Sequence, residues 1–301
     1  MRNRFVSSLR PVLVTIALLL AALPLGVHRA SAQIACDVPA TSPTSPAATP
    51  APAIPDATFP EDGGTLTIFA AASLTDAFAE MEATLEEAHP GLDIVIETAG
   101  SQTLVTQLQE GARADVLATA NTSTMQTAVE SGLIDGTPLP FTGNRLVIVT
   151  PENNPAGVES LDDLAQGDLK LVVAGADVPA GAYARQALCD YVTDGDAPDG
   201  FLDAVDANIV SEEPDVRSVL AKVQLGEADA GIVYASDAEA ARQAGQALHV
   251  VEFPASVPTT ALYPIAPVAG GNVELANAFI AYVLGDDGQA VLADYGFSPV
   301  S

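Results

Sequence analysis

Tryptophan is absent from this chain of 301 residues, which also contains only two cysteines and three histidines. Cys36 lies near the N-terminal region and Cys189 in the middle of the chain, so the sequence offers neither a disulfide framework nor a cysteine metal cluster. We expect Cys189 to pack as a small hydrophobic side chain. His28, His89 and His249 are isolated in sequence, which argues against a transition-metal site.

Basic residues are also scarce, with 11 lysines and arginines against 39 acidic residues and a formal net charge of −28. Residues 1–35 contain four of those arginines and no acid, so without them 7 basic and 39 acidic residues would give a charge of −32. Such a field repels nucleic acid and anionic membranes. A ligand that is an anion would have to be held by local hydrogen-bond donors.

Residues 1–35 have the layout of a secretory signal peptide, because three arginines precede an apolar run from residue 11 to 25. That run is shorter than the ~20 residues needed to span a bilayer, and no later segment is long enough. Two processing routes stay open. The small residues Ala30, Ser31 and Ala32 suit cleavage after Ala32, whereas Ala35-Cys36 could provide a lipidated cysteine, and otherwise Cys36 is a free thiol. We expect an exported protein, periplasmic or on the cell surface, with a lipid anchor through Cys36 as the alternative.

Residues 36–61 are rich in proline, threonine, alanine and serine, and we expect them to form a disordered linker. The remaining ~240 residues suffice for two domains of ordinary size. We predict one lobe from residues 62–143 together with 265–301, and a second lobe from residues 144–264.

Strands alternate with helices along this folded part, which predicts an α/β fold with helix-covered, mostly parallel sheets. In the first series, buried strands at 65–70, 92–96 and 115–118 are followed by helices at 73–88, 103–110 and 123–130. A second series has strands at 145–150, 169–174, 207–210 and 230–234, with helices near 181–191 and 214–225. A strand at 263–268 and helices near 273–284 and 288–295 could complete the first lobe.

Two serines lie where a strand passes into a helix. Ser73 follows three alanines and is followed three residues later by Asp76, which is the spacing of a capping box, so a simple helix cap is one interpretation. Ser101, after Gly100, has the same kind of position. The functional interpretation is that both face an oxyanion, because free N–H groups and the dipole favour an anion at a helix start. The carboxyl edge of a sheet is also where open α/β folds bind ligands.

Three loops of the second series offer further donors. Pro179 suits a first helical position, which could also be a simple Pro-initiated helix, and small neighbours expose backbone N–H groups of this segment. Asp215 is an ordinary helix cap before Val216. Tyr234 ends a strand, and such a phenol is more often a structural donor than a ligand contact.

The order and spacing of these motifs resemble the periplasmic molybdate-binding proteins of ABC importers, from about residue 65 to 299. The resemblance is carried by these segments: Phe69-Ala70-Ala71-Ala72-Ser73-Leu74, Ser101 with Leu104 and Gln107, Gly111-Ala112-Arg113-Ala114-Asp115-Val116, Gly143-Asn144-Arg145-Leu146-Val147, Val178-Pro179-Ala180-Gly181-Ala182-Tyr183-Ala184, Asp215-Val216-Arg217, Gly231-Ile232-Val233-Tyr234-Ala235-Ser236-Asp237 and Tyr295-Gly296-Phe297.

The resemblance implies a two-lobed type II periplasmic-binding fold with a hinge, and a molybdate or tungstate ion held between the lobes. Its contacts would be the hydroxyl and N–H of Ser73 and Ser101, the N–H of Ala180 and Val216, and the hydroxyl of Tyr234. The metal would be bound only as the oxyanion, with no direct protein ligand and no cofactor. The resemblance further implies a non-enzymatic monomer that delivers its ligand to an ABC permease and its ATPase.

A donor-only site fits a fully deprotonated dianion, which offers acceptors only. Sulfate meets the same requirement, so cavity size would have to distinguish it from molybdate. Glu212 and Glu213 depart from the family pattern and could raise the negative potential near Val216.

Three other functions compete with this one. A binding protein for sulfate or another tetrahedral oxyanion would share the fold. A serine hydrolase would use Ser73 or Ser101, but Ser101 lacks the Gly-x-Ser-x-Gly elbow and neither His89 nor His249 has a recognisable triad context. An iron-binding protein would use Tyr183 and Tyr234, without an identifiable supporting acid.

Overall fold

The computed structural model describes Ile34, Cys36 and residues 58–300. Apart from Ile34 and Cys36, the predicted leader and the predicted linker up to residue 57 lie outside the described residues. The folded part begins slightly before the predicted boundary, because Phe59 packs against the core and its ring lies 4.9 Å from that of His89.

The first half of the fold is built on three parallel strands, in which β1 pairs with both β2 and β3. The strands are β1 (Gly64–Ala71), β2 (Leu92–Ala99) and β3 (Val116–Ala118). Successive strand residues face opposite sides, so Ile68 packs in one buried cluster and Phe69 in the other. Both faces are therefore covered by helices. These are α1 (Thr75–Ala88), α2 (Ser101–Gln109), α3 (Thr122–Glu130), α8 (Val273–Leu284) and α9 (Asp286–Asp294), with the short 3-10 turn η1 (Ala72–Leu74) before α1.

The second half repeats the arrangement around β5, which pairs in parallel with β6 and β7. Its strands are β5 (Leu171–Ala174), β6 (Ile209–Glu213), β7 (Ala230–Tyr234) and β8 (Leu248–Glu252). Its helices are α4 (Pro179–Thr193), α5 (Phe201–Asn208), α6 (Val216–Gln224) and α7 (Ala235–Gln243), with a 3-10 turn η2 (Leu161–Ala165).

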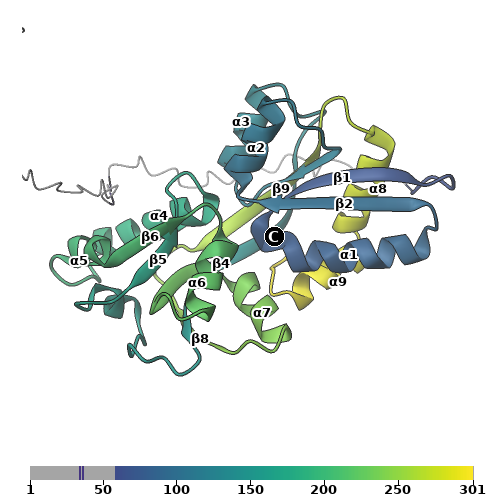
Figure 1. Ribbon diagram of the computed structural model, residues 1–301. Helices are drawn as coiled ribbons and strands as arrows, with labels where there is room; N and C mark the ends of the chain where they lie inside the picture. The colour runs from purple at the N-terminus through teal and green to yellow at the C-terminus, as the bar shows by residue number, and fades with distance from the viewer. Residues whose placement is uncertain (1–33, 35, 37–57, 301) are drawn as a thin grey trace, which may run out of the picture. The chain divides into compact units, whose positions relative to one another are not determined.

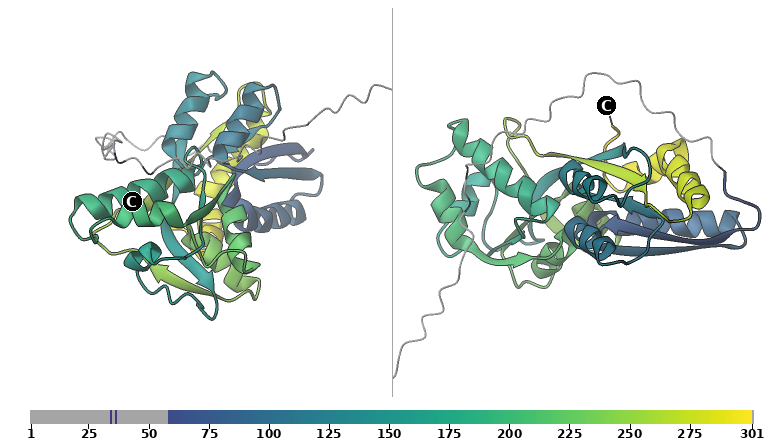
Figure 2. Two further views of the ribbon diagram at one scale, coloured as in Figure 1. Left: turned by 60° about the vertical axis from the view of Figure 1, so that its left-hand side comes forward. Right: turned by 90° about the horizontal axis from the view of Figure 1, so that it is seen from above.

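Two long strands connect the halves, β4 (Leu139–Pro151) and β9 (Thr260–Pro267). The first part of β4 pairs with β9, and its second part pairs with β7 and β8. Among the described residues the strand order is β2-β1-β3-β9-β4-β7-β5-β6, with β8 beside β4. Figure 1 shows β9 and β4 between the group around β1 and the group around β5. In Figure 2, right, the blue N-terminal strands and the yellow C-terminal helices lie together.

The sheet is mixed rather than mostly parallel, because every pairing of β4 and the pairing of β3 with β9 are antiparallel. The predicted lobe boundaries, 62–143 with 265–301 and 144–264, stay a prediction. The strand predicted at 207–210 was placed too early, since α5 runs to Asn208 and β6 follows it. The short helices and edge strands α5, α7 and β8 were not predicted, because their stabilising contacts are tertiary.

The prediction for the two cysteines was wrong. Cys36 forms a disulfide with Cys189, with the two Cα atoms 5.5 Å apart, which is ordinary disulfide geometry. The sulfur of Cys189, on α4, is therefore bonded rather than free. Sequence spacing cannot find such a pair, since the two residues are 153 positions apart.

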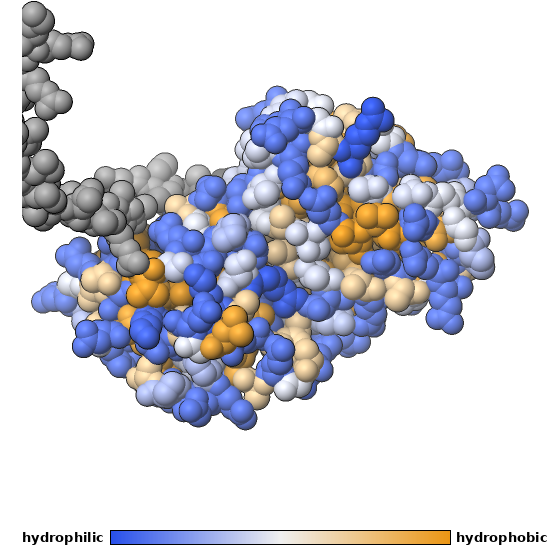
Figure 3. Space-filling view, in the orientation of Figure 1, coloured by the Kyte–Doolittle hydropathy of each residue, from blue (hydrophilic) through white to orange (hydrophobic). Residues whose placement is uncertain are grey.

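The surface seen in Figure 3 is largely hydrophilic, with apolar patches separated by polar and charged residues. Exposed large hydrophobic side chains include Val95 and Leu225, and some exposed apolar surface is ordinary for a folded protein. Within residues 58–300, no helix combines the length and apolar character that crossing a membrane requires.

Candidate functional site

All five residues predicted to contact an oxyanion line one small cavity: Ser73, Ser101, Ala180, Val216 and Tyr234. The first two come from the β1 half and the other three from the β5 half. The cavity volume is about 10 Å³, close to the room that a single water needs. The other lining residues are mostly small: Ala71, Ala72, Ala99, Gly100, Ala120, Val178, Pro179 and Asp215.

Each of these five residues lies at the start of a helix. Ser73 is in the turn that leads into α1, Ser101 is the first residue of α2, Ala180 the second of α4 and Val216 the first of α6, and Tyr234 directly precedes α7. Amide groups in the first turn of a helix have no partner within the helix. The cavity therefore lies beside several helix starts, where N–H groups without a partner inside the helix and the positive end of the helix dipole favour an anion.

The hydroxyl of Ser101 is oriented by a single backbone contact. Its oxygen accepts a hydrogen bond from the backbone N–H of Ala120 at 3.0 Å, and its side chain is buried. Since that contact occupies a lone pair and not the proton, the O–H of Ser101 remains available to donate into the cavity.

The hydroxyl of Ser73 is oriented by a chain of side chains. The backbone N–H of Arg145 donates to the side-chain oxygen Oδ1 of Asn144. The side-chain nitrogen Nδ2 of Asn144 therefore faces Tyr263 and Ser236. Asn144 Nδ2 donates to the Tyr263 oxygen at 3.3 Å, and that oxygen is 2.9 Å from Ser73 Oγ. Either oxygen can be the donor in this bond, and when the Tyr263 phenol donates, the proton of Ser73 is free for the cavity. Burial raises the pKa of Tyr263, so it stays a donor.

Tyr234 contributes the phenol in the cavity lining. Its hydroxyl makes no hydrogen bond to another described residue, although the residue is only 1% exposed. Burial raises its pKa well above the ordinary value, so the group is a protonated donor. Its backbone N–H donates to Asp237 Oδ2 at 3.1 Å, which fixes the residue at the start of α7. Buried polar groups are nearly always paired, so a buried hydroxyl at a cavity is a candidate donor to whatever occupies that cavity.

The charges around the cavity are mostly neutralised. Asp215 is the only ionisable residue besides Tyr234 in its lining, and the Asp215 carboxylate accepts from the N–H and hydroxyl of Ser218 at 2.8 and 3.0 Å. Glu212 pairs with Arg185 at 2.7 Å, and Glu213 pairs with Lys222 at 2.7 Å. Neither glutamate lines the cavity, and each has a cation beside it.

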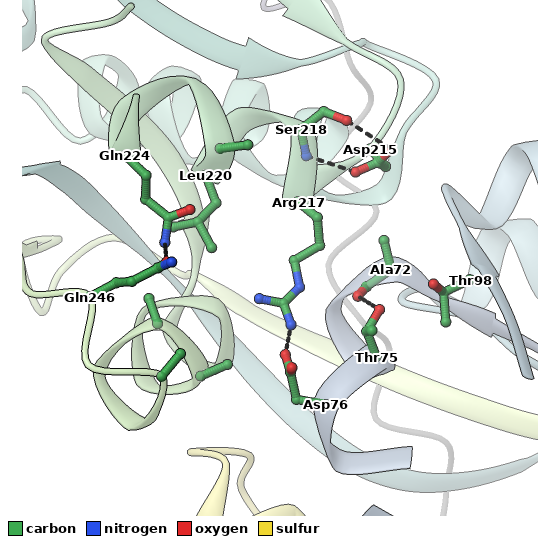
Figure 4. Close-up of a pocket in the computed structure, with 14 residues that line it drawn as sticks. Ala72, Thr75, Asp76, Thr98, Asp215, Arg217, Ser218, Leu220, Gln224 and Gln246 are labelled. Carbon is green, nitrogen blue, oxygen red and sulfur yellow. Dashed lines mark hydrogen bonds and ion pairs between the residues drawn. The ribbon is translucent and has the colours of Figure 1, made fainter. Parts of the chain in front are cut away.

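A larger cavity of about 560 Å³ adjoins the first, sharing Ala72 and Asp215. In Figure 4 the Arg217 side chain of α6 reaches across it to the carboxylate of Asp76 on α1. Arg217 Nε also lies 3.5 Å from Oδ1 of Asp237, which is fully buried. Burial raises the pKa of Asp237 to about 6 despite the opposing effect of Arg217. Arg217 is therefore an ionic connection between the two halves.

Comparison with known proteins identifies the family. The family model described as bacterial extracellular solute-binding protein matches residues 66–298. This chain belongs to that family. The prediction from the motifs is thereby confirmed at the level of the family.

Three similar proteins extend this assignment. Molybdate-binding protein ModA of Mycobacterium tuberculosis is 34% identical over 270 residues, covering 89% of this chain and 95% of the relative. The Escherichia coli protein of the same name is 35% identical over 244 residues, covering 79% and 90%. The solved periplasmic molybdate-binding protein of Azotobacter vinelandii superposes with a TM-score of 0.67 at 18% identity, covering 78% of this chain and 100% of the other. The predicted α/β periplasmic-binding fold is thereby confirmed.

Sequence reasoning missed the residues of this solute-binding protein that act behind the cavity. Asn144 and Tyr263 orient Ser73 from positions 71 and 190 residues away, so no local pattern connects them. Asn144 does lie in the quoted segment from Gly143 to Val147, which was the only signal. In the described part of the chain, no group of three or more His, Cys, Asp or Glu residues could hold a metal ion.

Proposed function

We propose that this solute-binding protein captures molybdate or tungstate outside the cytoplasm and delivers it to the permease and ATPase of an ABC importer. The metal is bound only as its oxyanion. The oxygens accept hydrogen bonds from Ser73 and Ser101 on one side, and from Ala180, Val216 and Tyr234 on the other.

The observation that carries this proposal is that five residues able to donate hydrogen bonds line the small cavity, above all Tyr234, while its one carboxylate, Asp215, accepts from Ser218. No lysine, arginine or histidine is among the residues that line it. A tetrahedral dianion without protons offers only acceptors, so every donor finds a partner and no acceptor of the protein is needed. A protonated anion such as HPO₄²⁻ would have to donate a proton, and the one carboxylate of the lining, Asp215, already accepts from the N–H and hydroxyl of Ser218.

The two related proteins named ModA support molybdate as the ligand, because each is described as molybdate-binding and aligns over most of this chain. The size of the cavity supports capture by a relative motion of the two halves. At about 10 Å³ it is too small for a tetrahedral oxyanion, so the β1 half and the β5 half would have to adjust around the ligand.

Two contacts are suited to stabilising the closed arrangement. Arg217 on α6 pairs with Asp76 on α1, and Gln102 Nε2 on α2 donates to the carbonyl of Pro214 before α6 at 3.0 Å. Both lie beside the cavity and join residues of different halves. The anion would bind one half, and closure would bring in the donors of the other half together with these contacts.

Sulfate is the second candidate ligand, since it too carries no proton and offers four acceptors. Only the size of the cavity in its liganded form would separate it from the larger molybdate and tungstate ions. A serine hydrolase is disfavoured by the partners of the serines. Ser73 contacts Tyr263, Ser101 contacts the Ala120 amide, and the two described histidines, His89 and His249, lie beside Phe59 and Glu159.

Isothermal titration calorimetry of the exported, oxidised protein with molybdate, tungstate, sulfate and phosphate tests the proposal. We expect one-to-one binding of the first two and little heat with the others. A Ser73→Ala/Ser101→Ala variant serves as the control that removes two donors without changing the fold class. Binding of sulfate alone would keep the oxyanion site and overturn the ligand. If the variant bound the anions as tightly as the unmodified protein, the small cavity would not be the binding site.

A further inference from the structure

The N-terminal segment of the described chain is attached to the second half of the fold by two contacts. Cys36 is bonded through its sulfur to Cys189 in the third turn of α4. Ile34, two residues earlier, is half-buried and packs against the main hydrophobic core. The two contacts are of different kinds, one covalent and one apolar.

These contacts bear on the two processing routes that the sequence leaves open. A lipid anchor at Cys36 would need its sulfur to form a thioether with a diacylglycerol, and a sulfur in a disulfide is not free to do so. Cleavage directly before Cys36 would also remove Ile34 and lose its packing. The disulfide keeps the sulfur of Cys36 from a lipid, and the packing of Ile34 favours a mature chain that starts at or before Ile34. The small residues Ala30, Ser31 and Ala32 provide a cleavage site two positions before it.

We infer that the leader is cleaved after Ala32, and that Cys36 is the disulfide partner of Cys189 and not a lipid-bearing residue. The mature chain then begins at Gln33 and is not anchored to a membrane through Cys36. Forming the bond oxidises the two thiols and transfers two electrons and two protons to a disulfide of an extracytoplasmic thiol oxidoreductase, which becomes a dithiol.

The disulfide should stabilise the fold without contributing to the oxyanion site. Cys189 lies nine residues beyond Ala180, so it is about 13 Å along the axis of α4 from the start of that helix. Its loss removes a cross-link that joins positions 153 residues apart, which restrains the unfolded chain. We expect the melting temperature to fall by roughly 5–10 °C, with the same ligand affinity. This inference does not depend on which ligand is bound.

Intact-mass spectrometry of the full chain, expressed with its own leader in a bacterium that has both the general and the lipoprotein signal peptidases, tests the inference directly. We expect the mass of Gln33–Ser301 less two hydrogens, and thiol alkylation only after reduction. A product that starts at Cys36 and carries a diacylglycerol would overturn it. A product that starts at Gln33 with two alkylatable thiols would overturn the disulfide.

Substitutions of the two cysteines provide a second test. Because three variants are compared, the test does not depend on the yield of any one of them. Cys36→Ser, Cys189→Ser and the double variant should all be exported in the same soluble form and show the same fall in melting temperature, because each removes one bond. If Cys36 instead carried a lipid, Cys36→Ser would move the protein from the membrane fraction to the soluble fraction. Cys189→Ser would then leave both its location and its melting temperature unchanged, and either result would contradict the inference.

Discussion

The two sides of the candidate site use different chemistry for the same task. On the β1 side the donors include the hydroxyls of Ser73 and Ser101, each oriented by a buried partner. On the β5 side two of the three proposed donors are backbone N–H groups, at Ala180 and Val216, whose own side chains are apolar. The position of each N–H is set by where its helix begins.

This difference determines how each side can be tested. A side-chain donor can be deleted by one conservative substitution, whereas a backbone donor stays unless the backbone itself moves. Selectivity on the β5 side therefore depends on how closely α4 and α6 approach the other half. The predictions below separate these two dependences.

The largest effect is expected from holding the two halves apart. A Cβ atom at Gly100 would lie 2.5 Å from the backbone carbonyl oxygen of Pro214, which belongs to the other half. The φ of Gly100 is −57°, so Gly100→Ala adds no backbone strain of its own. We expect the variant to lose the β5 donors and bind molybdate at least about 100-fold more weakly, with little change in melting temperature. Calorimetry and thermal unfolding would measure both.

Gly167→Ala is the matched control for this variant, because a Cβ there would meet no atom within 4 Å. It should bind like the unmodified protein. Normal affinity in Gly100→Ala would mean that binding does not need the approach of Pro214 to α2, and would count against closure.

Deleting a side-chain donor should have the next largest effect. A hydrogen bond to a charged ligand contributes ~1.5–3 kcal/mol, so Ser73→Ala and Ser101→Ala should each weaken binding roughly 10- to 100-fold. Ser101→Ala also leaves the buried N–H of Ala120 without its acceptor, at a cost of about 1–3 kcal/mol of unfolding free energy. Calorimetric titration would measure the affinity of both serine variants, and denaturant unfolding would measure their stability. Ser123→Ala, at an exposed position, is the control. Unchanged affinity for either serine variant would remove that serine from the site.

The relay behind Ser73 should have a smaller effect, visible in a double-mutant cycle. Tyr263→Phe removes the group that orients Ser73, and we expect about a 3- to 10-fold loss of affinity. In Ser73→Ala, Tyr263 keeps a buried O–H with nothing to donate to. Adding Tyr263→Phe to Ser73→Ala should therefore recover stability with no further loss of affinity. Additive affinity losses would show that Tyr263 acts independently of Ser73.

The sequence was sufficient for the local parts of this site and not for the others. Ser73 and Ser101 could be found because a strand end, small residues and a helix start lie within a few positions of each other. Ala180 and Val216 were found only through the family resemblance, since an apolar residue gives no chemical signal of its own. The Asn144–Tyr263 relay, the pairing of Cys36 with Cys189 and the antiparallel course of β4 all depend on residues brought together by the tertiary fold.

The ionic connection between the halves should contribute modestly. Asp76 is partly exposed, with 43% of its side chain accessible, and such pairs contribute about 0–1 kcal/mol. Asp76→Asn should thus weaken molybdate binding only about 2- to 5-fold, and more at low than at high salt. Arg145→Met, which removes an exposed ion pair within the second half, is the control and should leave the affinity unchanged. If high salt did not reduce the difference between Asp76→Asn and the unmodified protein, the pair would not act through its charges.

The last effect concerns the buried carboxylate behind Tyr234, and it should appear as a pH dependence of stability rather than as a change in affinity. Burial, with Asp215 adding to it and Arg217 opposing it, raises the pKa of Asp237 from its ordinary 3.8 to about 6 in the folded protein. The folded state therefore binds a proton here more readily than the unfolded chain, so this residue destabilises the fold when ionised above pH 6. The penalty, at most roughly 3 kcal/mol, is relieved as the pH falls from about 6 to 4.

Asp237→Asn isolates this contribution, because the amide oxygen can still accept from the Tyr234 N–H while the charge is gone. The variant should be more stable than the unmodified protein at pH 7, and the difference should shrink toward zero near pH 4. Denaturant unfolding of both proteins at pH 7, 6, 5 and 4 measures that difference, in which the other carboxylates cancel. A difference that stays constant over this range would mean that the pKa of Asp237 does not lie between 4 and 7 in the folded protein, and would contradict this prediction.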